Sequence, residues 1–477
     1  MRRLDAMTAR RTKIVATLGP STATPASMRA VIDAGADVVR INAAHGDAAS
    51  HAAAAMLAQK VAAELGRPIG VLVDLPGPKM RTGPITGGSV RIEAGEPFTL
   101  YARPVDGDAR GASTTVAGLA AMVRPGDPVV LADGQIRLRV LGLDGDDVQC
   151  EVVRGGLLSS RKGMFLPEAE HQVDPFTAAD ADALATAMAI RADFVGLSFV
   201  RSAADVEHVR ARLPRRGYRP KLMAKIETRR ALDHLPALIR ASDAVMVARG
   251  DLGIQIDVSE VPLVQKEIIH ACNVAGRPVV TATEMLESMT TSPLPTRAEA
   301  GDIANAVIDG TDALMLSAET ATGAYAADAV DTMARVAQAA ESWPRMRVSP
   351  DVEGVHVDRV AWAVAHAAVE AAQDLGVAAI LCPTRTGATA RRIAAFRPSV
   401  PVVGLSQRRH VRAALTLVWG VVPLALPGAP VPSHEIYQAV EVARTAGLVA
   451  TDDLVVVVAG APGPRAGGTD TMRVLRV

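Results

Sequence analysis

Residues 221–251 read KLMAKIETRRALDHLPALIRASDAVMVARGD, and this stretch decides the fold. Two apolar, β-prone runs flank a helical pattern, and each run ends in charged residues: Lys225 and Glu227 after the first, Asp251 after the second. Charges at the end of a buried strand cost free energy unless they are paired or used. One lysine beside two carboxylates suits a divalent cation and a ligand that carries phosphate or carboxylate. The stretch therefore indicates an enzyme built from strand–helix units.

The same alternation of strand and helix recurs along the chain. Continuous apolar runs are typical of parallel strands covered on both faces. The first helix begins at Thr24 and Pro25 and ends at Gly35, which are ordinary start and stop signals. The units predict a closed (β/α)₈ TIM barrel, whose active site lies at the carboxyl ends of the strands. The expected strands are Lys13–Thr17, Val38–Ile41, Gly70–Val73, Phe194–Ser198, Lys221–Ile226, Ala244–Ala248, Pro278–Thr281 and Ala313–Leu316.

Polar side chains follow several of these strands and should converge on one mouth of the barrel. Residues two apart on a strand share a face, so Lys225 and Glu227 should both face that mouth. A purely structural ion pair between them is the less favoured interpretation. Any single polar residue of a barrel rim could also be incidental. The strand-end residues include Arg40, Asn42, Asp74, Lys225, Glu227, Arg249, Gly250, Asp251, Thr283, Glu284, Ser317 and Glu319.

Two further segments depart from the barrel pattern. Residues 78–169 are rich in Gly, Pro and Asp with short alternating stretches, which predicts an inserted, mostly antiparallel small β barrel. The last part repeats the α/β pattern, with strands expected at 378–382, 400–404, 421–426 and 454–458 and a helix at 389–396. We expect the barrel to comprise residues 1–77 and 170–345, and a C-terminal α/β domain to comprise residues 346–477.

Composition argues against several classes of protein. The 51 Lys and Arg residues balance 51 Asp and Glu residues, so no basic field favours nucleic acid or an anionic membrane. We recognise no secretory signal and no apolar stretch long enough to cross a bilayer. Cys150, Cys272 and Cys382 lie far apart in apolar contexts, which favours buried free thiols in a reducing cytoplasm.

One turn of the C-terminal part could bind an anion. Thr384, Thr386, Gly387 and Thr389 present hydroxyl and backbone N–H groups at a predicted helix start. Ordinary helix capping by threonine explains the pattern equally well. Residues 460–471 are a plausible second loop of such a site.

Motifs in a fixed order give nearly the whole chain a resemblance to the pyruvate kinase family. The resemblance implies a barrel, a mobile lid, a C-terminal regulatory domain and a homotetramer. It also implies transfer of the phosphoryl group of phosphoenolpyruvate to ADP, which yields pyruvate and ATP in the last step of glycolysis. The motifs are TKIVATLGPS (12–21), RINAAHG (40–46), GPKMRTG (77–83), Lys162-Gly163, KIE (225–227), ARGDLG (248–253), ATEMLESM (282–289), PTRAE (295–299) and MLSAET (315–320).

The resemblance also implies roles in catalysis and metal binding. Glu227 and Asp251 would hold Mg²⁺, for which Mn²⁺ can substitute, and Lys225 would neutralise the phosphoryl group during transfer. Gly250 would let the substrate carboxylate approach the backbone. Thr283 would belong to the relay that delivers a proton to the enolate.

Further residues would contact the two substrates. Arg40 and Arg81 would grip phosphates with planar donor forks, and Ser317 would contact phosphoenolpyruvate. Lys162 would arrive from the lid when it closes. The nucleotide contacts are Asn42, His45, Arg81 and Lys162, although His45 could equally cap its loop.

Departures from the family pattern concern a monovalent cation. Ala44 and Leu75 replace two oxygen-bearing residues of a potassium site, of which Asn42 and Asp74 remain. Lys79 offers an ammonium group where potassium-dependent members have glutamate. We therefore expect activity without K⁺, although Lys79 could also be a solvated hinge residue. Glu284 and Phe165 are further departures and affect details of substrate binding.

Two other functions remain open at this point. A Mg²⁺-dependent barrel lyase or aldolase acting on a pyruvate enolate would also need two carboxylates, but not Arg81 and Lys162 on a lid. A non-catalytic relative, kept for assembly or regulation, would not need Lys225 and Thr283 intact. The effector could be a sugar bisphosphate, a sugar monophosphate or a nucleotide.

Overall fold

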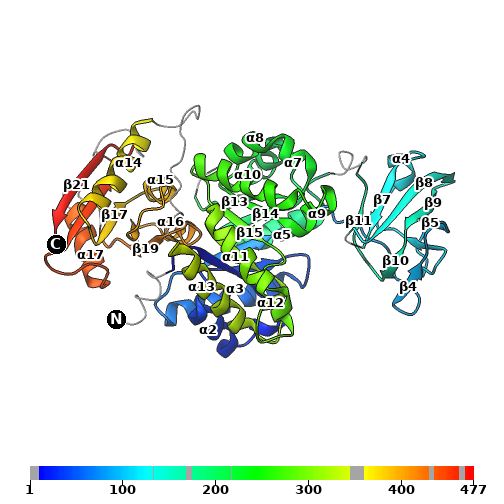
Figure 1. Ribbon diagram of the computed structural model, residues 1–477, viewed down its shortest axis with the longest axis horizontal. Coiled ribbons are helices and arrows are strands. Elements are labelled where there is room, and N and C mark those ends of the chain that lie inside the picture. Colours follow the sequence, from blue (N-terminus) through cyan, green and yellow to red (C-terminus); the bar gives the residue numbers. More distant parts are fainter. Residues whose placement is uncertain are drawn as a thin grey trace.

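The computed structural model describes residues 10–132, 134–167, 174–215, 217–343, 359–428, 435–460 and 468–477. It has three parts in a row: a barrel in the centre, a β insert on one side and an α/β domain on the other (Figure 1). In the described residues, no helix is both long and apolar enough to cross a membrane.

The central part is a closed barrel of parallel strands in the order β1-β16-β15-β14-β13-β12-β3-β2. All the barrel strands expected from the sequence are present, within one residue at either end. The bounds are β1 (Lys13–Thr17), β2 (Val38–Asn42), β3 (Gly70–Asp74), β12 (Phe194–Leu197), β13 (Lys221–Ile226), β14 (Ala244–Ala248), β15 (Val279–Ala282) and β16 (Ala313–Leu316).

Helices surround the barrel. The first shows why they form here, since Thr24 Oγ1 accepts from the Ser27 amide at 3.1 Å and Gly35 ends the helix at φ 130°. The helices are α2 (Pro25–Ala34), α3 (Ala48–Glu64), α5 (Ala178–Ala189), α6 (Ala203–Arg210), α7 (Arg229–Asp233), α8 (Leu235–Ala241), α9 (Arg249–Gln255), α10 (Val261–Val274), α11 (Arg297–Asp309), α12 (Ala318–Ala321) and α13 (Ala326–Glu341).

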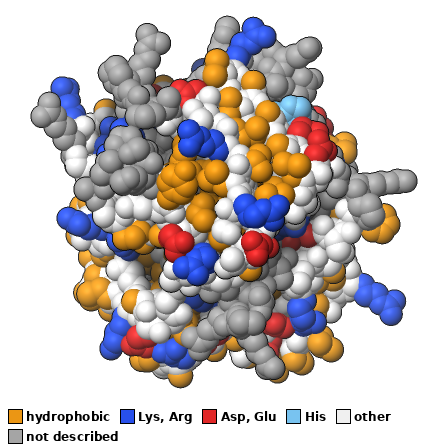
Figure 2. Space-filling model, turned by 90° about the vertical axis from the view of Figure 1, so that its left-hand side faces the viewer, with side chains coloured by type: hydrophobic (Ala, Val, Ile, Leu, Met, Phe, Trp, Pro, Cys, Tyr) orange, Lys and Arg blue, Asp and Glu red, His pale blue; other side chains and the backbone are white. Residues whose placement is uncertain are grey.

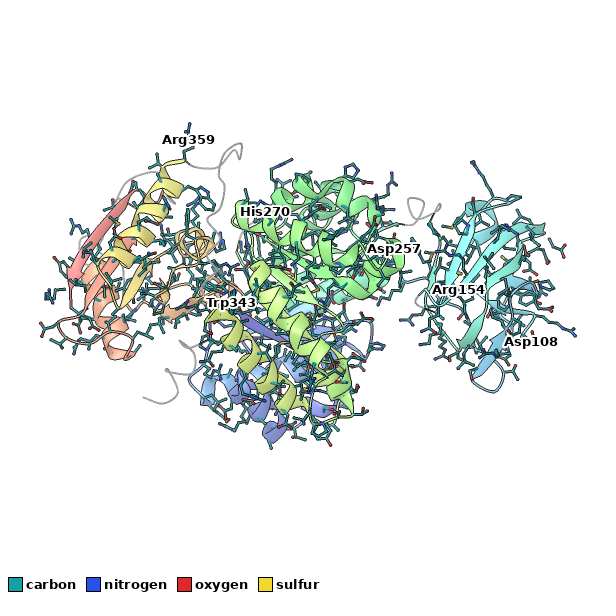
Figure 3. The ribbon with its side chains drawn as sticks, in the orientation of Figure 1. Asp108, Arg154, Asp257, His270, Trp343 and Arg359 are labelled. Carbon is teal, nitrogen blue, oxygen red and sulfur yellow. The ribbon has the colours of Figure 1, made fainter. Side chains whose placement is uncertain are left out.

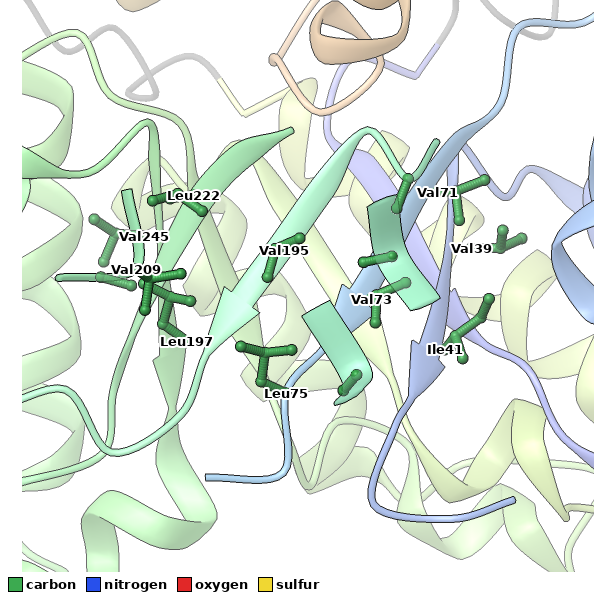
Figure 4. Close-up of a cluster of buried hydrophobic side chains, with 14 of the residues drawn as sticks. Val39, Ile41, Val71, Val73, Leu75, Val195, Leu197, Val209, Leu222 and Val245 are labelled. Carbon is green, nitrogen blue, oxygen red and sulfur yellow. The ribbon is translucent and has the colours of Figure 1, made fainter. Parts of the chain in front are cut away.

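Alternation along each strand separates two hydrophobic layers. On β3, Val71 and Val73 face the surrounding helices, in the cluster drawn in Figure 4, whereas Leu72 packs inside the barrel with Val38 and Met223. On each strand, every second side chain points inward, so the inward side chains nearest the carboxyl end of the strand reach the mouth of the barrel. This places Arg40, Asp74, Ser198, Lys225 and Glu227 on the inner side.

The insert between β3 and α5 is mostly antiparallel. Its larger sheet has the order β11-β7-β8-β9-β5-β6, and bridges from Arg81 to Gly163 and from Thr82 to Thr114 connect its two edges. The sheet therefore curls on itself around a core that includes Phe98, as a small barrel does. The elements are β4 (Ser89–Ile92), β5 (Pro97–Tyr101), β6 (Gly111–Ser113), α4 (Leu119–Met122), β7 (Pro128–Leu131), β8 (Ile136–Asp144), β9 (Asp147–Arg154), β10 (Gly156–Ser159) and β11 (Met164–Phe165).

The C-terminal domain is a sheet in the order β19-β18-β17-β20-β21. Its parallel strands match the predictions, but β21 was not predicted. That strand pairs antiparallel with β20 at the edge and alternates only weakly, because it carries two arginines. The elements are α14 (Arg359–Asp374), β17 (Ala379–Pro383), α15 (Ala388–Ala395), β18 (Val402–Ser406), α16 (Arg409–Leu415), β19 (Val421–Ala425), α17 (Glu435–Thr445), β20 (Leu454–Ala459) and β21 (Thr471–Arg476).

This domain closes the amino-terminal end of the barrel. Leu417 joins the hydrophobic cluster inside the barrel, and the Trp419 amide donates to Asp312 Oδ1 at 3.2 Å. Arg397 lies 3.6 Å from the same oxygen and stacks 4.7 Å from the Trp419 ring. The three cysteines are free and buried, as the sequence indicates.

Candidate active site

A cluster of buried charges lies inside the mouth of the barrel. Nε and Nη2 of Arg40 donate to Asp74 Oδ2 at 2.9 and 2.5 Å. Lys225 Nζ lies 3.2 Å from the same oxygen and 2.8 Å from Glu227 Oε1. Thus the Lys225–Glu227 ion pair, the less favoured interpretation of the sequence, is present. The alternation that turns both side chains inward also brings them together.

Burial and neighbouring charges set the protonation of this cluster. Burial, together with Asp251 and Asp74, raises the pKa of Glu227 to about 7, although Lys225 acts in the opposite direction. Burial alone would lower the pKa of Lys225, but Asp74 and Glu227 raise it above its usual value. Burial alone would raise the pKa of Asp74, but the neighbouring cations Lys225 and Arg40 hold it below its usual range. Lys225 therefore stays a cation at neutral pH.

Two uncharged residues at the end of β12 complete the cluster. Lys225 Nζ donates to Ser198 Oγ at 2.8 Å, and the Phe199 amide donates to Glu227 Oε2 at 2.7 Å. The sequence analysis missed both, because neither carries a charge. The inward alternation from Phe194 to Ser198 is the signal that could have found the serine.

A second group of residues lies at the ends of β14 and β15. The Gly250 amide donates to Thr283 Oγ1 at 2.8 Å, which brings these two predicted residues together. Arg249 holds the turn, since it donates to Thr283 O at 2.7 Å and pairs with Asp302 at 2.7 Å. Thr283 and Glu284 have φ values of 67° and 55°, a conformation that costs non-glycine residues free energy and is common at functional sites.

Ser317 lies at the end of β16, in a loop held by a buried carboxylate. Glu319 accepts from the Ser317 amide at 2.7 Å and from the Leu286 amide at 3.0 Å. Glu319 therefore connects the ends of two strands. In the described residues, no hydrogen bond joins Ser317 to the Lys225 cluster.

A cavity of about 290 Å³ lies between the barrel and the insert. Lys79, Arg81, Lys162 and Asp251 line it, so residues of both parts meet there. The Thr82 amide donates to the Lys162 carbonyl at 2.9 Å, which makes Arg81 and Lys162 neighbours although they lie 81 positions apart in the sequence. In Figure 3, Asp257, just after α9, lies on the edge of the barrel that faces the insert, which carries Asp108 and Arg154.

Asn42, the last residue of β2, and His45, in the loop after it, were predicted to contact the nucleotide, but neither lines this cavity. Asn42 Oδ1 accepts from the Ala44 amide at 3.2 Å, and the side chain of His45 is exposed. His51 contacts the carbonyl of His45 at 2.6 Å. The neighbouring His51, rather than His45, therefore secures this loop.

The predicted effector loop lies in the C-terminal domain, on the side of the barrel opposite the insert (Figure 1). Thr384 Oγ1 accepts from the Gly387 amide at 2.9 Å, and Thr386 Oγ1 from the Ala388 amide at 3.4 Å. Thr389 is buried and hydrogen-bonds Thr469 Oγ1 at 2.7 Å, so its hydroxyl is already engaged. The N-cap of α15 is Gly387, which offers no side-chain cap, so these hydroxyls bind amides of the turn that leads into the helix and no threonine caps it in the ordinary way. Most of the predicted second loop, residues 461–467, lies outside the described residues.

Phosphoryl transfer needs cationic groups around a phosphate, together with exclusion of water. The barrel supplies Lys225 and Arg40, and the insert adds Arg81 and Lys162 beside the cavity. The fold and these cationic side chains are therefore those that a phosphotransferase needs.

Comparison with known proteins identifies the family. The sequence-family model of the pyruvate kinase barrel domain matches residues 9–330. The family model of the pyruvate kinase alpha/beta domain matches residues 362–475. Pyruvate kinase of Clostridium acetobutylicum is 38% identical over 97% of this chain and 99% of its own length. Pyruvate kinase of Mycobacterium tuberculosis is 39% identical over 98% of both.

A solved structure of a pyruvate kinase from Cryptosporidium parvum superposes with a TM-score of 0.89 at 34% identity, covering 99% of this chain and 97% of its own. The chain belongs to the pyruvate kinase family. Its reaction is accordingly the transfer of a phosphoryl group from phosphoenolpyruvate to ADP, and the lyase or aldolase alternative is not favoured.

Proposed function

We propose that this chain carries out the reaction with Mg²⁺ at Glu227 and Asp251 and with Lys225 as the residue that neutralises the moving phosphoryl group. The observation that carries the proposal is the Lys225 ammonium, buried among carboxylates at the barrel mouth. An ammonium with a raised pKa keeps its charge throughout turnover, and its place is fixed before substrate binds.

The residues fit a divalent cation. Glu227 is fully buried, and in the described part of the chain the Lys225 ammonium is the only partner of its Oε1. Asp251 adds a second carboxylate, and its repulsion adds to the effect of burial in raising the pKa of Glu227. No group of three or more His, Cys, Asp or Glu side chains in the described residues could hold a metal, so substrate and water oxygens would complete the coordination. When bound, the ion would supply positive charge to the phosphate and carboxylate of the substrate.

The remaining residues would bind and orient the two substrates and deliver a proton to the enolate. Arg40 would present its guanidinium to the phosphate while Asp74 fixes its orientation. Arg81 and Lys162 would approach the nucleotide phosphates from the lid side of the cavity. Gly250 would let the substrate carboxylate approach its backbone, whose amide donates to Thr283 Oγ1 in this structure. Thr283, held by the Gly250 amide, would belong to the proton relay to the enolate.

Asn42, His45 and Ser317 are proposed as further substrate contacts on the family resemblance alone. Asp74 supports the proposal that no K⁺ is required, because two cationic side chains already neutralise its carboxylate. Lys79 would supply the remaining positive charge from the lid side of the cavity, which it lines.

We further propose domain boundaries at 1–77, 78–169, 170–345 and 346–477, with the insert acting as a lid. A cytoplasmic location agrees with three free, buried cysteines. A homotetramer is proposed from the family. Figure 2 shows hydrophobic side chains gathered on the outer face of the C-terminal domain, and such a face suits contact between subunits.

A coupled assay tests the proposal. Purified protein with phosphoenolpyruvate, ADP and Mg²⁺ should form pyruvate, which lactate dehydrogenase reports through NADH oxidation. Omitting Mg²⁺ or adding a chelator should abolish the rate, and Mn²⁺ should restore part of it. A protein that forms no pyruvate under these conditions would support the non-catalytic alternative.

A further inference from the structure

Ser198 and Phe199 follow β12 directly, and each contacts a different charged member of the active-site cluster. Ser198 Oγ accepts a hydrogen bond from Lys225 Nζ at 2.8 Å. The Phe199 amide donates to Glu227 Oε2 at 2.7 Å, from a backbone with φ 54°. One short turn therefore holds both the ammonium and the carboxylate, and the strained backbone of Phe199 indicates that the surrounding packing enforces this geometry.

Ser198 also contacts the segment by which the chain leaves the barrel for the lid. Its hydroxyl donates to the Leu75 carbonyl at 2.7 Å. Gly77, two residues further, packs so closely that a Cβ there would lie 2.8 Å from Ser198 Cβ and 3.0 Å from Phe199 Cδ2. Ser198 is only 4% exposed. It therefore lies between the base of the lid and Lys225.

The hydrogen-bond directions fix the role of this hydroxyl. A serine has a single O–H donor, and Ser198 directs it at Leu75 O, which leaves its lone pairs for Lys225. An ammonium has three N–H donors, and in the described part of the chain the acceptors around Lys225 Nζ are Ser198 Oγ, Glu227 Oε1 and Asp74 Oδ2. Because the lysine side chain is a flexible stem, these acceptors decide where its charge lies.

We propose that Ser198 is a positioning residue for phosphoryl transfer, acting through Lys225. This inference rests on the catalytic role proposed above for Lys225. When one N–H of Lys225 turns to a phosphoryl oxygen, Ser198 and Asp74 hold the other two, and the ammonium stays aligned with the path of transfer.

Substitution of Ser198 by alanine tests this role. Loss of a hydrogen bond to a charged group should lower kcat about tenfold to a hundredfold and leave KM for phosphoenolpyruvate within about twofold. Ser198→Cys keeps the size and a weak acceptor, so its kcat should be intermediate. The matched control is Ser242→Ala, which removes a buried hydroxyl donating to Leu238 O at 2.7 Å at the opposite end of the barrel. Both alanine variants should show similar Tm values, but only Ser198→Ala should lose kcat.

A double substitution separates this role from that of Lys225. In a Lys225→Met background, Ser198→Ala should change kcat less than about twofold, because the group through which it acts is gone. An unchanged kcat in Ser198→Ala, a rise in KM alone, or an equal loss in Ser242→Ala would overturn the role of Ser198. If Lys225→Met itself keeps its kcat, the role proposed for Lys225 fails as well. If kcat falls in Lys225→Met but not in Ser198→Ala, only the role proposed for Ser198 fails and that of Lys225 stands.

Discussion

Arg40 and Asp74, at the ends of adjacent strands β2 and β3, form a buried ion pair in which Nε and Nη2 both donate to Oδ2, at 2.9 and 2.5 Å. Asp74 Oδ1 has no hydrogen-bond partner in the described residues. It packs closely against Gly196, where an added Cβ would lie only 2.6 Å from it. Lys225 adds a second cation to Oδ2. The carboxylate that would remain from a potassium site is therefore neutralised by the protein itself.

This neutralisation predicts that the enzyme needs no K⁺. Mg²⁺-dependent activity should be the same in Na⁺, tetramethylammonium and K⁺ salts at constant ionic strength, because in this proposal Lys79 would supply the positive charge that K⁺ would bring. Lys79→Glu should reduce activity sharply, and K⁺ should restore part of it in that variant. Many-fold activation of the unmodified enzyme by K⁺ would contradict the prediction.

Lys225→Met should lower kcat by about 10²–10³-fold or more, because one preorganised charge is lost from the path of transfer. Mg²⁺ and phosphoenolpyruvate should still bind, as isothermal calorimetry can measure. Proton exchange on bound pyruvate should persist, since Thr283 is intact. Near-normal ATP formation by the variant would exclude this role.

Lys162→Ala should impair turnover without unfolding the barrel, because Lys162 lies beside Arg81 on the lid side of the cavity. The exposed Lys60 on α3 provides the control, and Lys60→Ala should behave as the parent. Replacement of residues 78–169 by a short linker should leave a folded barrel that binds Mg²⁺ but turns over poorly. Full activity of that protein would rule out a lid.

Stability should fall as pH rises because of Asp193, at the amino-terminal end of β12. Burial raises its pKa to about 6, although Arg409 acts in the opposite direction from 3.6 Å. A folded-state pKa above the unfolded value means that the folded state binds more protons between about pH 4 and 6, so stability present at low pH is lost through that window.

Asp193→Asn keeps an acceptor for the Val71 amide and should remove the loss of stability with rising pH, because the amide does not ionise. Its stabilisation should be small near pH 3, reach about half of its full value near pH 5, and level off on the order of 2–3 kcal/mol above pH 7. Differences in Tm across this range measure it, with the exposed Asp233→Asn as control. A constant Tm difference at all pH values would show that Asp193 does not titrate in this window.

A phosphorylated metabolite should raise the affinity for phosphoenolpyruvate by binding near Thr384, Thr386 and Gly387, where backbone N–H groups meet at the start of α15. By reciprocity, phosphoenolpyruvate should tighten the effector by the same factor. Calorimetry against sugar phosphates and nucleotides measures the coupling, and the exposed Thr386→Ala should weaken it. Thr389 should matter less to the ligand, because its hydroxyl is bonded to Thr469. Absence of coupling throughout the panel would eliminate the site.

The sequence predicted the elements well wherever short-range patterns decide them. The barrel strands are continuous apolar runs, and caps such as Thr24 depend on residues three positions apart. β21 was missed because an exposed edge strand with Arg473 and Arg476 lacks the hydrophobic signal of its neighbours. The ion pair between Lys225 and Glu227 was underrated because alternation fixes the face of a side chain but not its partner.

By itself, therefore, the sequence determined which residues form strands and which side chains face the inside of the barrel, because alternation is a local property of an extended chain. Only the tertiary structure decided which inward side chains meet. Ser198 reaches Lys225, and Arg40 reaches Asp74, because closure of the barrel fixes the register between strands that lie tens of residues apart. Likewise, curling of the insert makes Arg81 a neighbour of Lys162. Such contacts depend on hydrogen bonds between distant segments, which no local pattern encodes.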